Sequence, residues 1–167
     1  MKRRKLFILT LLLTAGVAWS MEIDPQETQS PSFSWAGVFQ LKPGRHIATF
    51  SKVGGKYHSS AIRLVILKSG RSGIDAVEDL QVKAGRLSQT EPIISPGGKG
   101  ILVRPAEALY QLTLEPEKAS TGYGIEIEEV GTYVLFLGMR PELFSPGRYF
   151  FTDRENRAVK PDVERTY

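Results

Sequence analysis

No cysteine occurs among the 167 residues, and histidine occurs only twice. The absence of cysteine excludes disulfides, thiolate metal sites, c-type haem attachment, catalytic thiols and a lipidated cysteine. A Ser-His-Asp triad would have to use His46 or His58, and the Gly-x-Ser-x-Gly motif of many hydrolases is also absent. Residues 97–100 read Gly-Gly-Lys-Gly, without the Ser or Thr that follows the lysine of a phosphate-binding loop. We therefore expect a protein that is not an enzyme and carries no cofactor.

Acidic residues are missing from the start of the chain. No Asp or Glu precedes Glu22, whereas residues 2–5 read Lys-Arg-Arg-Lys. Those four residues account for the whole net charge of +4, because the other 18 cations equal the 18 anions in number. A domain without surplus positive charge is not expected to bind nucleic acid.

Residues 1–20 have the three parts of a secretory signal peptide. The basic cluster is followed by the apolar run 6–17, and the small residues Ala18 and Ser20 stand at positions that signal peptidase reads. The run is shorter than the roughly 20 residues that a transmembrane helix requires. We predict cleavage after Ser20 and a periplasmic or extracellular location. The alternative is an uncleaved signal, through which alone the protein would contact a membrane.

The segment after the signal changes from a polar leader to a strand pattern. Residues 21–34 are polar with two prolines, which is typical of a flexible leader. Residue types then alternate in 35–41, a Lys-Pro-Gly-Arg turn occupies 42–45, and the alternation resumes in 46–51. Proline presets φ at one corner of such a turn and glycine tolerates positive φ at the next. This pattern predicts a β-hairpin.

Further along the chain, short strand patterns surround one helical pattern. Residues 61–67 are apolar on both faces, which predicts a central strand covered on both sides. Apolar residues at three- and four-residue steps predict a short helix over 74–83, and Ser72 with Asp75 resembles a capping box. A loop rich in Pro and Gly is expected over 89–100. Other strands are expected at 101–103, 109–114, 123–127, 132–137 and 148–152, the last pairing with 157–159.

These elements predict an all-β fold. We expect a single antiparallel β-sandwich, Ig-like or cupredoxin-like, over residues 35–161, with one short helix. The signal peptide and leader precede this domain, and a polar tail at 162–167 follows it.

Four residues are candidates for a metal site. His46, His58, Met139 and Glu142 supply imidazole, thioether and carboxylate groups, which suit copper or zinc. Neither histidine belongs to an HxH or HxxxH pair. The alternative interpretations are a buried ring on a strand for His46 and a solvated turn residue for His58.

The consecutive aromatics Tyr149, Phe150 and Phe151 predict a contact surface. Successive strand side chains face opposite sides of a sheet, so we expect Phe150 or one of its immediate neighbours to point outward. Phe144 and Arg148 lie close by in sequence, and aromatic residues with arginine are enriched at protein interfaces. The alternative is that the helix or the leader covers this face and buries all three rings.

The opening segment, Trp35-Ala-Gly-Val-Phe-Gln-Leu-Lys-Pro-Gly-Arg45, continued by Phe50-Ser-Lys-Val-Gly-Gly-Lys-Tyr57, resembles a family of small bacterial secreted domains. Its members open with a WAGxFxLxPGxY…FxKVxGxY pattern, and the segments 131–133 and 150–153 are similar in place and order. The resemblance implies a β-sandwich and export.

Some members of that family carry an EHMPxEF segment and a later histidine, which implies metal handling. Here the corresponding segment, residues 137–144, reads Leu-Gly-Met-Arg-Pro-Glu-Leu-Phe, and residues 148–149 stand where the later histidine would be. Only Met139 and Glu142 remain of that ligand set.

Two functions follow as expectations. The first is an exported, non-catalytic binding or accessory module that acts through a protein or small-ligand surface, with a periplasmic or envelope protein as partner. The second is a periplasmic copper- or zinc-binding protein.

Overall fold

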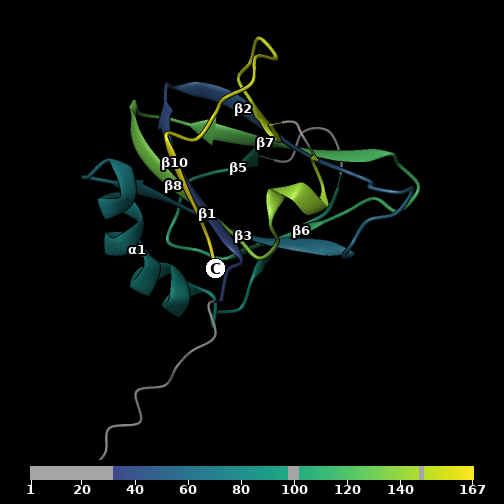
Figure 1. Ribbon diagram of the computed structural model, residues 1–167, viewed down its shortest axis with the longest axis horizontal. Helices are drawn as coiled ribbons and strands as arrows, with labels where there is room; N and C mark the ends of the chain where they lie inside the picture. Colours follow the sequence, from purple (N-terminus) through teal and green to yellow (C-terminus); the bar gives the residue numbers. More distant parts are fainter. Residues whose placement is uncertain (1–31, 98–101, 147–148) are drawn as a thin grey trace, which may run out of the picture.

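The computed structural model describes residues 32–97, 102–146 and 149–167. The predicted signal peptide, most of the leader and Arg148 lie outside the described residues. The described chain forms two β-sheets packed face to face and one α-helix, which confirms the all-β sandwich (Figure 1).

Each sheet is built from strands that are distant in sequence. The larger sheet contains, in spatial order, β10 (Val163–Thr166), β1 (Trp35–Leu41), β8 (Gly131–Leu137), β3 (Ala61–Ser69), β6 (Tyr110–Thr113) and β4 (Ile93–Ser95). The smaller sheet contains β5 (Leu102–Val103), β7 (Ser120–Ile127), β2 (Gly44–Ser51) and β9 (Phe151–Thr152). Neighbouring strands are antiparallel except β4 with β6 and β5 with β7, so the sandwich is mixed rather than wholly antiparallel.

The predicted hairpin of β1 and β2 is wrong. β1 pairs with β8 and β10, whereas β2 pairs with β7 and β9, so the turn at Lys42–Pro43 carries the chain from one sheet to the other. Gly44, with a φ of 126°, provides the backbone geometry of this crossing. β1 and β2 join different sheets because β1 carries apolar side chains on both faces. Only the larger sheet is packed on both of its faces, by the smaller sheet and by the helix.

Helix α1 (Gly73–Leu87) covers the outer face of the larger sheet and is longer than the predicted 74–83. Its buried residues Ala76, Val77 and Ala84 pack in one cluster with Val65 of β3 and Phe136 of β8. Ser72 occupies the N-cap position, but its side chain makes no capping hydrogen bond. The molecule therefore has three layers, a helix and two sheets.

Strand β3 confirms the prediction of a doubly covered central strand. Leu64 and Ile66 belong to the core between the sheets, whereas Val65 and Leu67 lie under the helix. The strand is flanked by β6 and β8, so both of its edges are also paired.

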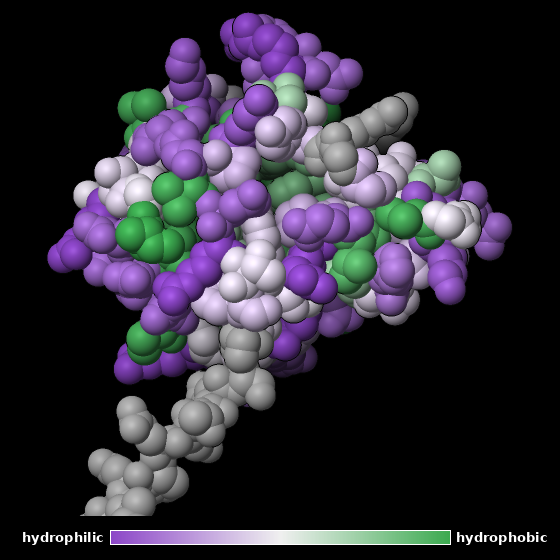
Figure 2. All heavy atoms as spheres, in the orientation of Figure 1, coloured by the Kyte–Doolittle hydropathy of each residue, from purple (hydrophilic) through white to green (hydrophobic). Residues whose placement is uncertain are grey.

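The predicted polar tail and the predicted loop at 89–100 both contribute strands. Residues 163–166 form β10, which pairs with β1, and the Trp35 indole donates a hydrogen bond to Glu164 at 3.1 Å. Residues 93–95 form β4, which pairs with β6. The domain thus extends beyond its predicted end at residue 161. Apolar side chains on the face drawn in Figure 2 form separate small groups among polar ones.

An aromatic cluster joins the two sheets, and it contains Phe150. The Phe150 ring lies 5.7 Å from Trp35 and 5.4 Å from Phe144, between ring centroids, and its exposed fraction is 6%. Phe150 itself therefore does not face outward, whereas its neighbour Tyr149 is exposed. The prediction assumed that a strand begins at residue 148, but β9 begins only at Phe151. Strand alternation does not apply before that residue, and both rings enter the core.

We predict that Phe150→Ala lowers the free energy of unfolding by about 3–5 kcal/mol, because it removes a large ring from a packed core. Tyr149→Ala, at a neighbouring side chain with an exposed fraction of 47%, is the matched control and should change it by less than about 1 kcal/mol. Urea unfolding followed by circular dichroism measures both values. Similar small losses for the two variants would contradict the burial of Phe150.

Candidate functional site

The residues predicted to form a contact surface are mostly buried. Phe144 and Phe151 lie in the core with Phe150. Only Tyr149 is exposed among the described members, and the Lys160 ammonium lies 5.0 Å from its ring centroid. The group therefore does not form a shared outer surface, because the sheets rather than the helix or leader bury its rings.

His46 is a buried ring on β2, with an exposed fraction of 6%. Its ring stacks on Phe151 with centroids 5.4 Å apart, and Nε2 lies 3.0 Å from the Lys42 carbonyl oxygen. A carbonyl oxygen only accepts, so Nε2 donates this bond. Nδ1 is buried without a hydrogen-bond partner in the described structure.

The other metal candidates lie apart from His46 in the fold. His58 is exposed and follows the turn at Gly54–Gly55, beyond the end of β2, whereas His46 stands near the start of that strand. Met139 packs partly against the core, and Glu142 is exposed in the short helix η1 (Pro141–Leu143). Within the described ranges no group of three His, Cys, Asp or Glu side chains is placed to hold a metal ion.

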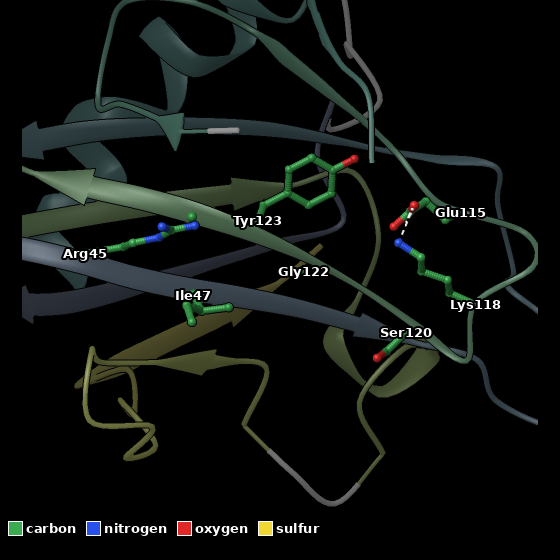
Figure 3. A pocket seen from close by; sticks show the side chains of 8 residues that line it. Arg45, Ile47, Glu115, Lys118, Ser120, Gly122 and Tyr123 are labelled. Carbon is green, nitrogen blue, oxygen red and sulfur yellow. Dashed lines mark ion pairs between the residues drawn. The ribbon is translucent and has the colours of Figure 1, made fainter. Parts of the chain in front are cut away.

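A hollow of about 290 Å³ lies over β2 and β7 of the smaller sheet (Figure 3). In the view of Figure 3, Arg45 stands at one end and the ion pair of Glu115 with Lys118 at the other. The lining residues are Arg45, Ile47, Glu115, Lys118, Ser120, Gly122, Tyr123 and Gly124. Sequence analysis did not predict this site.

Strand alternation produces the floor of the hollow. On β2, His46, Ala48 and Phe50 are buried in the core, so the intervening side chains face outward. Opposite them on β7, the outward positions 122 and 124 are both glycine, and Gly124 pairs with Ile47 in the register. Gly122 is exposed and Gly124 is buried, so the backbone of β7 is bare at Gly122.

Packing among the described residues does not require glycine at position 122. A Cβ atom at this position would have one neighbour within 4 Å, Ile47 Cγ2, at an ordinary contact distance of 3.8 Å. At Gly37, in contrast, an added Cβ would collide with the Trp35 ring, so glycine is a structural necessity there. Glycine weakens a strand interior and often marks the close approach of a ligand or another backbone.

The two ends of the hollow differ in charge pairing. Lys118 Nζ lies 2.6 Å from Glu115 Oε1, so these two charges offset each other. Arg45 is exposed and forms no ion pair with any described residue. One uncompensated cation therefore faces the hollow.

Tyr123 anchors the strand below the hollow. Its ring is fully buried and its hydroxyl donates to the carbonyl oxygens of Ser95 and Thr113, the former at 3.1 Å. Burial, with a smaller contribution from the Glu115 charge, raises the pKa of Tyr123 to about 12. The neutral phenol thus ties β7 to β4 and β6 of the opposite sheet.

A signal for this site was present in the sequence. Gly122 and Gly124 occupy the same face of β7 by strand alternation, and strand interiors rarely carry two glycines on one face. The partner residues Arg45 and Ile47 could not be found in the same way, because the pairing of β2 with β7 follows from the fold.

The fold and the hollow define the chain as a β-sandwich domain with one open sheet face. Comparisons with protein-family models, with curated proteins and with solved structures give no match. No helix among the described residues is long and apolar enough to cross a membrane.

We predict unequal losses of stability for the same change at the two glycines. Gly37→Ala should lower the free energy of unfolding by about 1–3 kcal/mol, because the Trp35 ring must move. Gly122→Ala should change it by no more than about 0.5 kcal/mol. Thermal and urea unfolding of both variants provide the comparison, and a large loss for Gly122→Ala would show that its glycine serves packing.

The raised pKa of Tyr123 predicts a loss of stability in alkali. The unfolded phenol ionises from about pH 10, whereas the folded one stays protonated up to about pH 12, so the unfolded state releases its proton first. This contribution is complete below pH 10 and is lost as the pH rises towards 12. Tyr123→Phe keeps the buried ring but has no hydroxyl to ionise. Between pH 10 and pH 12 the free energy of unfolding of wild type should therefore fall relative to that of Tyr123→Phe. A constant difference in urea unfolding across that interval would contradict the burial of the phenol.

Proposed function

We propose that this protein is a non-catalytic binding module whose ligand occupies the hollow on the outer face of the smaller sheet. The observation that carries the proposal is Gly122, a glycine in a strand interior that no internal contact requires. The cost of glycine in a strand is explained if a ligand approaches the backbone at this point.

The size and position of the hollow support this proposal. Its volume of about 290 Å³ is near the lower end of the range for small-ligand sites, roughly 300–1,000 Å³. The floor belongs to β2 and β7, the longest strands of the smaller sheet, which are paired along their whole length. A site on a rigid sheet needs little ordering when a ligand binds.

The chemistry of the lining favours binding over catalysis. A general base needs an unpaired group within reach of the substrate, and the carboxylate of Glu115 is occupied by Lys118. Both histidines lie away from the lining. Export through residues 1–20, a periplasmic or extracellular location and an envelope protein as partner remain part of the proposal, and the metal-binding alternative gains no support from any cluster of side chains in the described chain.

We predict that ligands of the module perturb the amide resonances of Gly122, Gly124 and Ile47. The test is a screen of small molecules, short peptides and oligosaccharides by ¹H–¹⁵N correlation spectra of the mature protein. Gly122→Val should weaken the binding of any hit at least about tenfold, because its branched side chain fills the floor of the hollow.

Thr166→Val is the control, since it places valine at an exposed position of β10 in the other sheet. It should leave binding unchanged, and both variants should unfold close to the wild-type midpoint. Hits that perturb another surface, or that bind Gly122→Val as well as wild type, would refute the proposed site.

A further inference from the structure

The outer face of the smaller sheet carries a set of free hydroxyl groups beside the hollow. Thr49 and Ser51 alternate with the inward residues of β2, and Thr152 pairs with Ile47 from the neighbouring strand β9. Ser120 lines the hollow itself, from β7. Among the described residues, none of these four hydroxyls has a hydrogen-bond partner. Each can therefore donate and accept a bond with a ligand.

The charged groups at the hollow provide both donors and acceptors. Glu115 and Lys118 stand together at one end, and Arg45 alone stands at the other. Glu126 is opposite Arg45 in the strand register but forms no ion pair with it in the described structure. The lining thus offers several polar groups and one surplus cation, far fewer than the run of phosphate contacts that a nucleic acid requires.

Most backbone hydrogen-bonding groups of β2, and those of β7 on the side that faces β2, are already paired within the sheet. β7 is flanked by β2 and β5, and β2 is flanked by β7 and β9. The amides of Thr49 and Ser51 donate to the carbonyl oxygens of Phe150 and Phe144, which precede β9 in the chain. An extended peptide recognised by strand addition needs an open sheet edge, and the hollow lies on a face. Its ligand is therefore expected to be held mainly by side chains.

We propose that the ligand is an oligosaccharide that bears a carboxylate, an inference that rests on the proposed function. A sugar ring presents hydroxyls around its rim, which match the Ser and Thr hydroxyls and the Glu115–Lys118 pair. Its flat face can lie on the bare backbone at Gly122, where a side chain would keep it away. The carboxylate pairs with Arg45, whose guanidinium can donate two parallel hydrogen bonds.

The test is calorimetric titration of the mature protein with tri-galacturonate, tri-mannuronate and a hyaluronate tetrasaccharide, each beside its methyl ester. At least one acid should bind, and its ester, which has no charge, should bind about tenfold more weakly. Arg45→Gln should weaken the binding of the acid by a similar factor and leave the binding of the ester unchanged. Arg71→Gln is the control, since Arg71 is an exposed cation paired with Asp79 of α1.

The outcomes separate this inference from the proposed function. Failure of all three acids to bind, or equal binding of acid and ester, overturns the inference. In that case hits of another chemistry that perturb Gly122 and are lost in Gly122→Val would still uphold a binding site at the hollow. If no compound in either experiment perturbs Gly122, both proposals fail.

Discussion

The rest of the structure depends on the packing of aromatic rings between the two sheets. Phe50 of β2 lies at the centre, 4.9 Å from Phe144 and 6.2 Å from both Phe150 and Tyr123. Trp35 of the larger sheet meets this group through Phe150. Tilted and edge-on ring pairs contribute beyond their buried area, so this cluster fixes how the sheets face each other. Because the smaller sheet is held from its inner side, its outer face needs no cover.

The two outer faces of the sandwich have different chemistry. The outer face of the larger sheet presents Ala36, Val38 and Val65, and helix α1 removes them from water. The outer face of the smaller sheet presents hydroxyls, charges and Gly122 of β7, and Ile47 is only half-buried there. One face thus contributes to stability through burial, while the other is free to meet a ligand.

Alternation in the sequence predicted the burial of many strand side chains, though not of Phe150, and it did not predict which strands are neighbours. The strand at 61–67 and the burial of Tyr110 and Leu112 follow from local patterns. The pairing of β1 with β8 does not, because two-sided burial is compatible with many partners. β10 was missed because it has a single apolar residue, Val163, and depends on main-chain pairing at a sheet edge. The hollow was missed for a related reason, since its walls come from two strands whose register only the fold defines.

The crossings between sheets have a consequence for the order of folding. β1 leaves the larger sheet directly for β2, so neither of its neighbours is close to it along the chain. Residues 35–41 can pair only after residues 131–137, on one edge, and residues 163–166, on the other, have been brought beside them. Contacts of such long sequence separation require loop-closure entropy to be lost before they form, and they slow folding. β1, the first of the described strands to be synthesised, is therefore among the last to gain both of its neighbours.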